Sequence, residues 1–78
     1  MSTMVVAFVL CVTDAGMERT VVDKLLQFEE VDEAHVVYGE YDVIAKVNVA
    51  ELKLLDKFIT ERIRSIKEIQ MTSTMISI

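Results

Sequence analysis

The sequence predicts an α+β fold in which four antiparallel strands form one sheet and two helices cover one of its faces. Two observations support this prediction. Along the 78 residues, segments with strand-like and helix-like patterns follow the order strand, helix, strand, strand, helix, strand. The chain has no proline and only two glycines, and nothing in it resembles a flexible linker. We therefore expect a single domain that spans residues 1–78.

The first half of the chain carries one strand and one helix. Residues 4–12 are an uninterrupted apolar run whose length suits a strand buried on both faces. Residues 13–16 break this run with turn and cap residues. Residues 17–28 show apolar positions at helical spacing and predict an amphipathic helix. Those apolar positions are Val21, Val22, Leu25 and Phe28.

A β-hairpin is predicted next. Residues 32–38 and 42–47 are rich in valine and isoleucine, which favour strands. Glycine permits backbone angles that other residues avoid, so a tight turn is expected at Gly39 and Glu40. The polar residues of this turn and its exit make a candidate site for a small polar molecule. They are Gly39, Glu40, Tyr41 and Asp42.

The second helix is predicted over residues 51–66. Asn48 followed by Glu51 has the spacing of a capping box, and Val47 with Leu52 suits a hydrophobic staple. The apolar stripe of this helix consists of Leu52, Leu55, Phe58, Ile59, Ile63 and Ile66. Residues 68–78 return to alternation and predict the last strand. The order of elements is that of a split-βαβ, ferredoxin-like fold.

The first strand is apolar on both sides of the predicted sheet. Two sets of apolar residues alternate along it: Met4, Val6, Phe8, Leu10 and Val12 on one side, and Val5, Ala7, Val9 and Cys11 on the other. One set can pack beneath the helices, and the other would form a large exposed apolar patch on a monomer. A chain this short also gains little stability from its own core. We therefore expect two copies to dimerise through their sheets with two-fold symmetry.

The net charge and the single cysteine indicate which partners and which cellular compartment to expect. A formal net charge of −5 opposes non-specific attraction to nucleic acid or anionic membrane. The basic residues late in the chain are interleaved with acidic ones and indicate a solvated helix face; they are Lys53, Lys57, Arg62, Arg64 and Lys67. The apolar run at residues 4–12 is too short to span a bilayer and lacks the basic flank of a signal peptide. A single cysteine and no export signal predict a cytoplasmic protein.

Sequence motifs of catalysis are absent. The chain has no P-loop, dinucleotide fingerprint, nucleophile elbow or metal-ligand spacing, so we predict no enzymatic activity, no cofactor and no metal site. His35 has no serine or cysteine partner at suggestive spacing and is interpreted as structural. Cys11 lies inside an aliphatic run and is interpreted as an inert core thiol.

Asp42 and the hydroxyl residues of the last strand are the remaining side chains that could contact a polar ligand. Thr72 and Thr74 are two positions apart, so their side chains point to one side of the sheet, and Ser73 points to the other. The threonine hydroxyls either contact a small polar ligand or are ordinary strand side chains. Asp42 either fixes the local backbone after the turn or pairs with an ammonium group.

With these residues placed, the chain resembles the effector-binding domain, called RAM, of the Lrp/AsnC transcription regulators over essentially its whole length. The most specific motif is Gly-x-Tyr-Asp at residues 39–42, and a weaker one is the Thr-x-Thr pattern at Thr72 and Thr74. Lys67 and Glu68 stand where that family usually has a glycine. The resemblance implies a βαββαβ fold that dimerises through its sheets, with dimers assembling into octameric or decameric rings.

The resemblance also implies that a free amino acid binds between neighbouring dimers. Asp42 would accept the ligand's ammonium, backbone N–H groups from Gly39 to Tyr41 would meet its carboxylate, and Thr72 and Thr74 would add hydroxyl contacts. Full-length members carry an N-terminal helix-turn-helix domain, whereas here only Met-Ser-Thr precedes the first strand. We therefore expect a stand-alone module that contacts neither nucleic acid nor membrane directly and that is able to join full-length regulators.

The leading hypothesis is a non-catalytic, amino-acid-binding oligomeric effector module that modulates transcription regulation of amino-acid metabolism. One alternative is a structural assembly module in which the turn residues only make subunit contacts. Another is a small dimeric ferredoxin-like enzyme, such as a cofactor-free monooxygenase. The enzyme would need a polar pocket between helices and sheet, and the nearly aliphatic helical stripes disfavour it.

Overall fold

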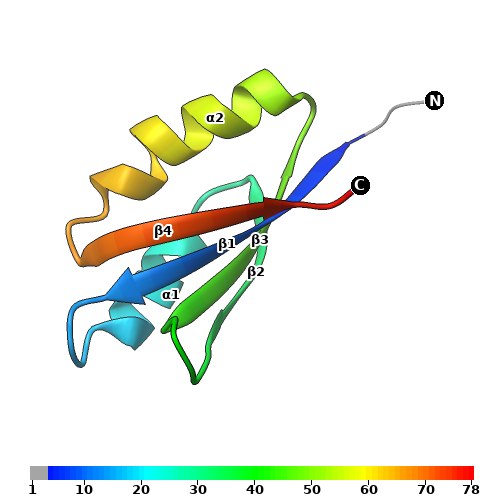
Figure 1. The fold of residues 1–78 in the computed structure, drawn as a ribbon. Helices are drawn as coiled ribbons and strands as arrows, with labels where there is room; N and C mark the ends of the chain where they lie inside the picture. The colour runs from blue at the N-terminus through cyan, green and yellow to red at the C-terminus, as the bar shows by residue number, and fades with distance from the viewer. Residues whose placement is uncertain (1–3) are drawn as a thin grey trace.

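A computed structural model describes residues 4–78 and shows the predicted βαββαβ order of elements (Figure 1). The elements are β1 (Val5–Thr13), α1 (Glu18–Leu25), β2 (Val31–Val36), β3 (Val43–Val49), α2 (Leu52–Glu61), the short 3-10 helix η1 (Ile63–Ser65) and β4 (Ile69–Ile76). The strands form one antiparallel sheet in the order β2-β3-β1-β4. The predicted ferredoxin-like fold is therefore confirmed, with β2 and β4 as its two edges.

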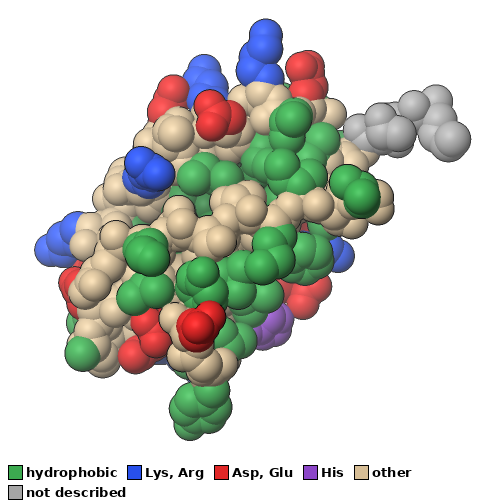
Figure 2. Space-filling model, viewed as in Figure 1, with side chains coloured by type: hydrophobic (Ala, Val, Ile, Leu, Met, Phe, Trp, Pro, Cys, Tyr) green, Lys and Arg blue, Asp and Glu red, His purple; other side chains and the backbone are tan. Residues whose placement is uncertain are grey.

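The two faces of the sheet differ as the alternation in β1 predicts. Ala7, Val9 and Cys11 are completely buried on the side that carries the helices. Phe8 and Leu10 point to the opposite side and are only partly buried. The register places on this open face Val6, Phe8, Leu10 and Val12 of β1, Ile44 of β3, and Met71 and Met75 of β4. Figure 2 shows hydrophobic side chains gathered across this face.

Helix α1 is shorter than its sequence pattern predicts. It ends at Leu25 rather than at residue 28, because the chain tightens into turns with Gln27 N–H bonded to the Lys24 carbonyl and Phe28 N–H bonded to the Leu25 carbonyl. The helix is held to the sheet by its buried side chains Val21, Val22 and Leu25. Phe28 remains partly buried against the core and extends the predicted apolar stripe beyond the helix.

The predicted start of the second helix is wrong. Strand β3 runs on to Val49, which pairs with Val5, so Asn48 lies in the strand and does not cap a helix. The Asn48 amide instead donates a hydrogen bond to the Asp32 carboxylate. Glu51 is the N-cap residue and makes no side-chain capping bond. Ladder pairing with β1 and β2 has overridden the local capping signal.

The predicted hydrophobic staple is also wrong, since Val47 is fully buried in the sheet and Leu52 is 57% exposed. The rest of the predicted apolar stripe is confirmed: Leu55, Phe58, Ile63 and Ile66 are buried, and Ile59 packs against the core. Helix α2 ends at Glu61, five positions before the predicted end at residue 66, and η1 follows. None of the helices in residues 4–78 has the length and apolar character to cross a lipid bilayer.

An ion pair joins α1 to the start of β4. Lys24 Nζ lies 2.8 Å from Glu68 Oε1, and the Glu68 side chain is only 7% exposed. The Asp14 N–H donates to the Glu68 carbonyl at 2.9 Å, so both the backbone and the side chain of Glu68 are held. The hydrogen bond from Lys24 is the main reason that the pKa of Glu68 lies below its ordinary value, against the opposing effect of desolvation.

This ion pair predicts acid sensitivity. A carboxyl group whose pKa is lower in the folded state stabilises the fold above the pKa of an unfolded glutamate, about 4.3, and loses that contribution as pH falls through the lower folded value. We expect Glu68→Gln to lower the urea midpoint at pH 7 and to flatten the loss of stability below about pH 4. The exposed Glu29→Gln variant is the control. Parallel acid limbs for wild type and Glu68→Gln would contradict the prediction.

Candidate functional site

The loop between β2 and β3 is longer than a two-residue turn but closes at the predicted place. The Val37 N–H donates to the Asp42 carbonyl at 2.9 Å and closes the loop. Gly39 lies within it at a φ of +124°, a backbone angle that residues with a Cβ rarely adopt. Glu40 is exposed and Tyr41 is partly buried. The motif residues therefore do share one loop at the end of the sheet.

Asp42 fixes this loop to β1. Its N–H donates to the Cys11 carbonyl at 2.8 Å, and its Oδ2 accepts a hydrogen bond from the Thr13 N–H at 2.9 Å. Asp42 therefore does hold backbone, but through Thr13 on β1, 29 positions away in the sequence, and not within its own turn. Asp42 as a whole remains partly exposed.

Thr72 and Thr74 share one side of β4, as predicted. They pair with Cys11 and Val9, whose side chains point toward the helices, so the two hydroxyls lie on the helix side of the sheet. Ser73 pairs with Leu10 and lies on the open face. Both threonines are partly buried.

A groove lies beside the first half of β4, with a volume of about 450 Å³. It is lined by Ile69, Gln70, Met71 and Thr72 from the strand and by Arg64 from η1. From the sequence, Arg64 is interpreted as one charge of a solvated helix face, so its place in the groove is not predicted. Its position just before the last strand was the available signal, because the chain must turn back there toward the sheet.

Asp42 and Thr72 lie on opposite flanks of β1 at the same end of the sheet. Asp42 bonds to Cys11 from the β3 side, and Thr72 pairs with Cys11 from the β4 side. Adjacent strands are about 4.8 Å apart, so two strand spacings separate the backbones of Asp42 and Thr72 by about 10 Å, while the Asp42 carboxylate reaches across to Thr13 on β1. A single chain brings these residues to one end of the molecule and does not bring them into contact.

Comparison with known proteins identifies the family to which this fold and sequence belong. A family model described as the Lrp/AsnC ligand binding domain matches residues 6–78. The chain belongs to this family. Among curated relatives, the uncharacterized HTH-type transcriptional regulator PH0140 of Pyrococcus horikoshii is 35% identical over 72 residues, which are 92% of this chain and 46% of that protein. The Lrp/AsnC domain thus spans about half the length of the curated relatives that it matches.

Solved structures of similar proteins agree in fold. The hypothetical protein PHS023 from Pyrococcus horikoshii is 65% identical, with a TM-score of 0.90 over 95% of this chain and 89% of that one. FFRP-DM1 is also 65% identical, with a TM-score of 0.91 over 95% of this chain and 99% of that one. The resemblance inferred from the Gly-x-Tyr-Asp and Thr-x-Thr motifs is therefore confirmed at the level of the family.

Lrp/AsnC ligand-binding domains are non-catalytic, which agrees with the prediction that this chain is no enzyme. Cys11 is fully buried, and burial raises the pKa of its thiol to about 11, so the thiolate is scarce at neutral pH. His35 is exposed on β2, and its Nε2 lies 3.1 Å from Glu33 Oε1. Residues 4–78 hold no cluster of three or more side chains suited to bind a metal ion.

Proposed function

We propose that this Lrp/AsnC domain is an amino-acid-binding effector module that modulates transcription of amino-acid metabolism genes in the cytoplasm. The observation that carries the proposal is the match of residues 6–78 to a ligand-binding domain. The groove beside Thr72 adds support, because its volume of about 450 Å³ lies within the usual range for small-molecule sites.

The ligand would be held by complementary charges from two chains. In this proposal Asp42 accepts the ammonium, and backbone N–H groups from Gly39 to Tyr41 meet the carboxylate. Thr72 and Thr74 add hydroxyl contacts, and the Arg64 guanidinium at the groove offers a second anchor for a carboxylate. The family resemblance implies a site between neighbouring dimers, and within one chain the backbones of Asp42 and Thr72 are about 10 Å apart, with β1 between them. The loop of one copy and the groove of another would therefore form the site together.

Assembly would follow from the open face of the sheet. We propose that two copies pack these apolar faces together and that such dimers associate further into octameric or decameric rings. Both helices of residues 4–78 pack on the sheet, so we propose that the module itself does not read DNA. It would act on transcription by joining regulators such as PH0140, which is described as an HTH-type regulator and is about twice as long as the matched region.

A thermal-shift screen against free amino acids tests the proposal, because a ligand that binds only the folded state raises its stability by mass action. We expect one or a few amino acids at millimolar concentration to raise the melting temperature. Asp42→Asn should abolish that rise, since the amide keeps an oxygen to accept the Thr13 N–H but loses the charge that attracts an ammonium.

Asp42→Asn is preferable to Asp42→Ala, which would also remove the hydrogen bond to Thr13 and loosen the loop. Exposed Asp23→Asn on α1 is the matched control and should leave the ligand shift intact. If no amino acid stabilises the wild-type protein, the structural assembly module becomes the better description. A full ligand shift in Asp42→Asn would reject the role assigned to this carboxylate.

A further inference from the structure

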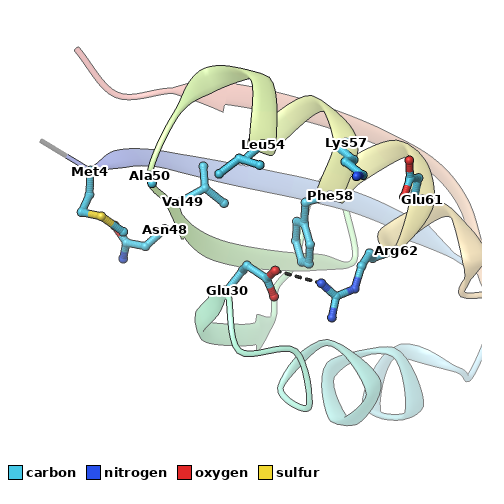
Figure 3. A pocket seen from close by; sticks show the side chains of 10 residues that line it. All are labelled: Met4, Glu30, Asn48, Val49, Ala50, Leu54, Lys57, Phe58, Glu61 and Arg62. Carbon is cyan, nitrogen blue, oxygen red and sulfur yellow. Dashed lines mark hydrogen bonds and ion pairs between the residues drawn. The ribbon is translucent and has the colours of Figure 1, made fainter.

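A second pocket lies at the other end of the sheet, far from the Asp42 loop. Its volume is about 370 Å³, and it opens between α2, the end of β3 and the turn before β2 (Figure 3). Its apolar walls are Met4, Val49, Ala50, Leu54 and Phe58. Its polar lining consists of Glu30, Asn48, Lys57, Glu61 and Arg62. The whole of β3 separates this pocket from the Asp42 loop, a length of about 20 Å.

The polar end of this pocket is an ion pair fixed by aromatic rings. Arg62 donates from Nη1 to Glu30 Oε2 at 2.9 Å. The guanidinium carbon lies 5.1 Å from the centroid of the Phe28 ring and 5.6 Å from that of Phe58. The two rings meet edge to face with centroids 5.4 Å apart. Stacking and the ion pair together hold the Arg62 side chain along the pocket.

This ion pair is incompletely satisfied. Glu30 Oε1 is buried, and no donor among the described residues reaches it. An enclosed carboxylate oxygen without a donor is unfavourable. A guanidinium has five N–H donors, and the hydrogen bond to Glu30 uses one. Glu30 Oε1 is thus an acceptor without a donor, and it lies next to Arg62 N–H groups that the bond to Glu30 does not use.

The charges around the pocket favour a neutral ligand. Glu30 and Glu61 are balanced by Lys57 and Arg62. An ammonium would approach the cations Arg62 and Lys57, and a carboxylate would approach Glu30 and Glu61, so either ion meets a like charge. A group with one donor and one acceptor side by side matches the ion pair without disturbing its charge balance.

We propose that this pocket binds a neutral primary carboxamide with an apolar substituent. The amide N–H donates to Glu30 Oε1, the amide oxygen accepts from Arg62, and the substituent lies on Leu54 and Phe58. Because Oε1 is enclosed, ligand entry requires the Arg62 side chain, which is 46% exposed, to move from its position over the Phe28 and Phe58 rings. The ligand differs from a zwitterionic amino acid, and the site is independent of the Asp42 loop.

Titration of ¹⁵N-labelled protein with hydrocinnamamide, followed by NMR, tests this proposal. We expect saturable shifts at the backbone amides of Ala50, Leu54 and Phe58 and at the Arg62 side chain, with a dissociation constant on the order of 1 mM for a ligand this small. The N,N-dimethyl amide lacks the N–H donors and should bind at least about 10-fold more weakly.

Two exposed leucines of α2 give a matched pair of variants. Leu54 lines the pocket and is 43% exposed, whereas Leu52 is 57% exposed and lies outside the lining. Leu54→Glu should abolish the shifts, and Leu52→Glu should preserve them. Equal affinity for the two amides, shifts centred on Gly39 or Thr72, or no saturable shift would each overturn the proposal. Loss of binding in Leu52→Glu would overturn it as well.

Discussion

Phe8→Glu should convert the protein from a dimer or larger assembly into a monomer that remains folded. Phe8 lies centrally on the open face, between Lys46 of β3 and Met75 of β4. It is not among the side chains that pack against the core. A two-fold interface would bury the new carboxylate twice, at an effective penalty of several kcal/mol per ion. The dissociation constant should therefore rise by at least about 10³-fold.

Light scattering at micromolar concentration measures this change, and circular dichroism reports whether the fold persists. Leu52→Glu is the control, because it places the same charge on an exposed position of α2, away from the open face. It should leave the oligomeric state unchanged. If Phe8→Glu retained the wild-type mass, or if the wild-type protein were itself a monomer, the proposed sheet-to-sheet dimer and the shared ligand site would both be rejected.

Much of the fold could be predicted from local patterns, because two periodicities decide which side chains are buried. The alternation in β1 assigned Ala7, Val9 and Cys11 to one face, and the register confirms it. Helical spacing likewise assigned Leu55 and Phe58 to the core. The ends of the helices were predicted less well, since backbone pairing between strands overrides a local capping pattern such as the one at Asn48.

Only the loop of the candidate site could be predicted from the sequence, and the reason differs from that for the helix ends. The Gly39–Asp42 loop is local, so its residues are recognisable as a motif. The groove at Arg64 and the Glu30–Arg62 pair arise from side chains brought together by the tertiary fold. Glu30 and Arg62 are 32 positions apart in the chain, and Lys24 and Glu68 are 44 apart. Helix and strand periodicities relate only residues close together in the chain, so they do not predict such pairs. The composition gives the number of charged residues but not which of them meet.

Leu25→Ala should cause the largest loss of stability among single substitutions in α1. Leu25 is fully buried and is one of only three buried side chains that fix this helix to the sheet. Removing its isobutyl group leaves a cavity that costs about 2–5 kcal/mol. A domain of 78 residues has a total unfolding free energy of about 4–12 kcal/mol, so this single change removes a large share of it.

The measurement is best made in the Phe8→Glu background, where unfolding does not depend on protein concentration. Urea melts of that monomer with and without Leu25→Ala should differ in midpoint, with a nearly unchanged slope. Leu26→Ala is the matched control, because the neighbouring leucine is 48% exposed and its loss should change the unfolding free energy by less than about 1 kcal/mol. Equal effects of the two substitutions would mean that α1 does not pack through Leu25. In that case the helix-covered face, like the open face, would depend on a partner chain for its stability.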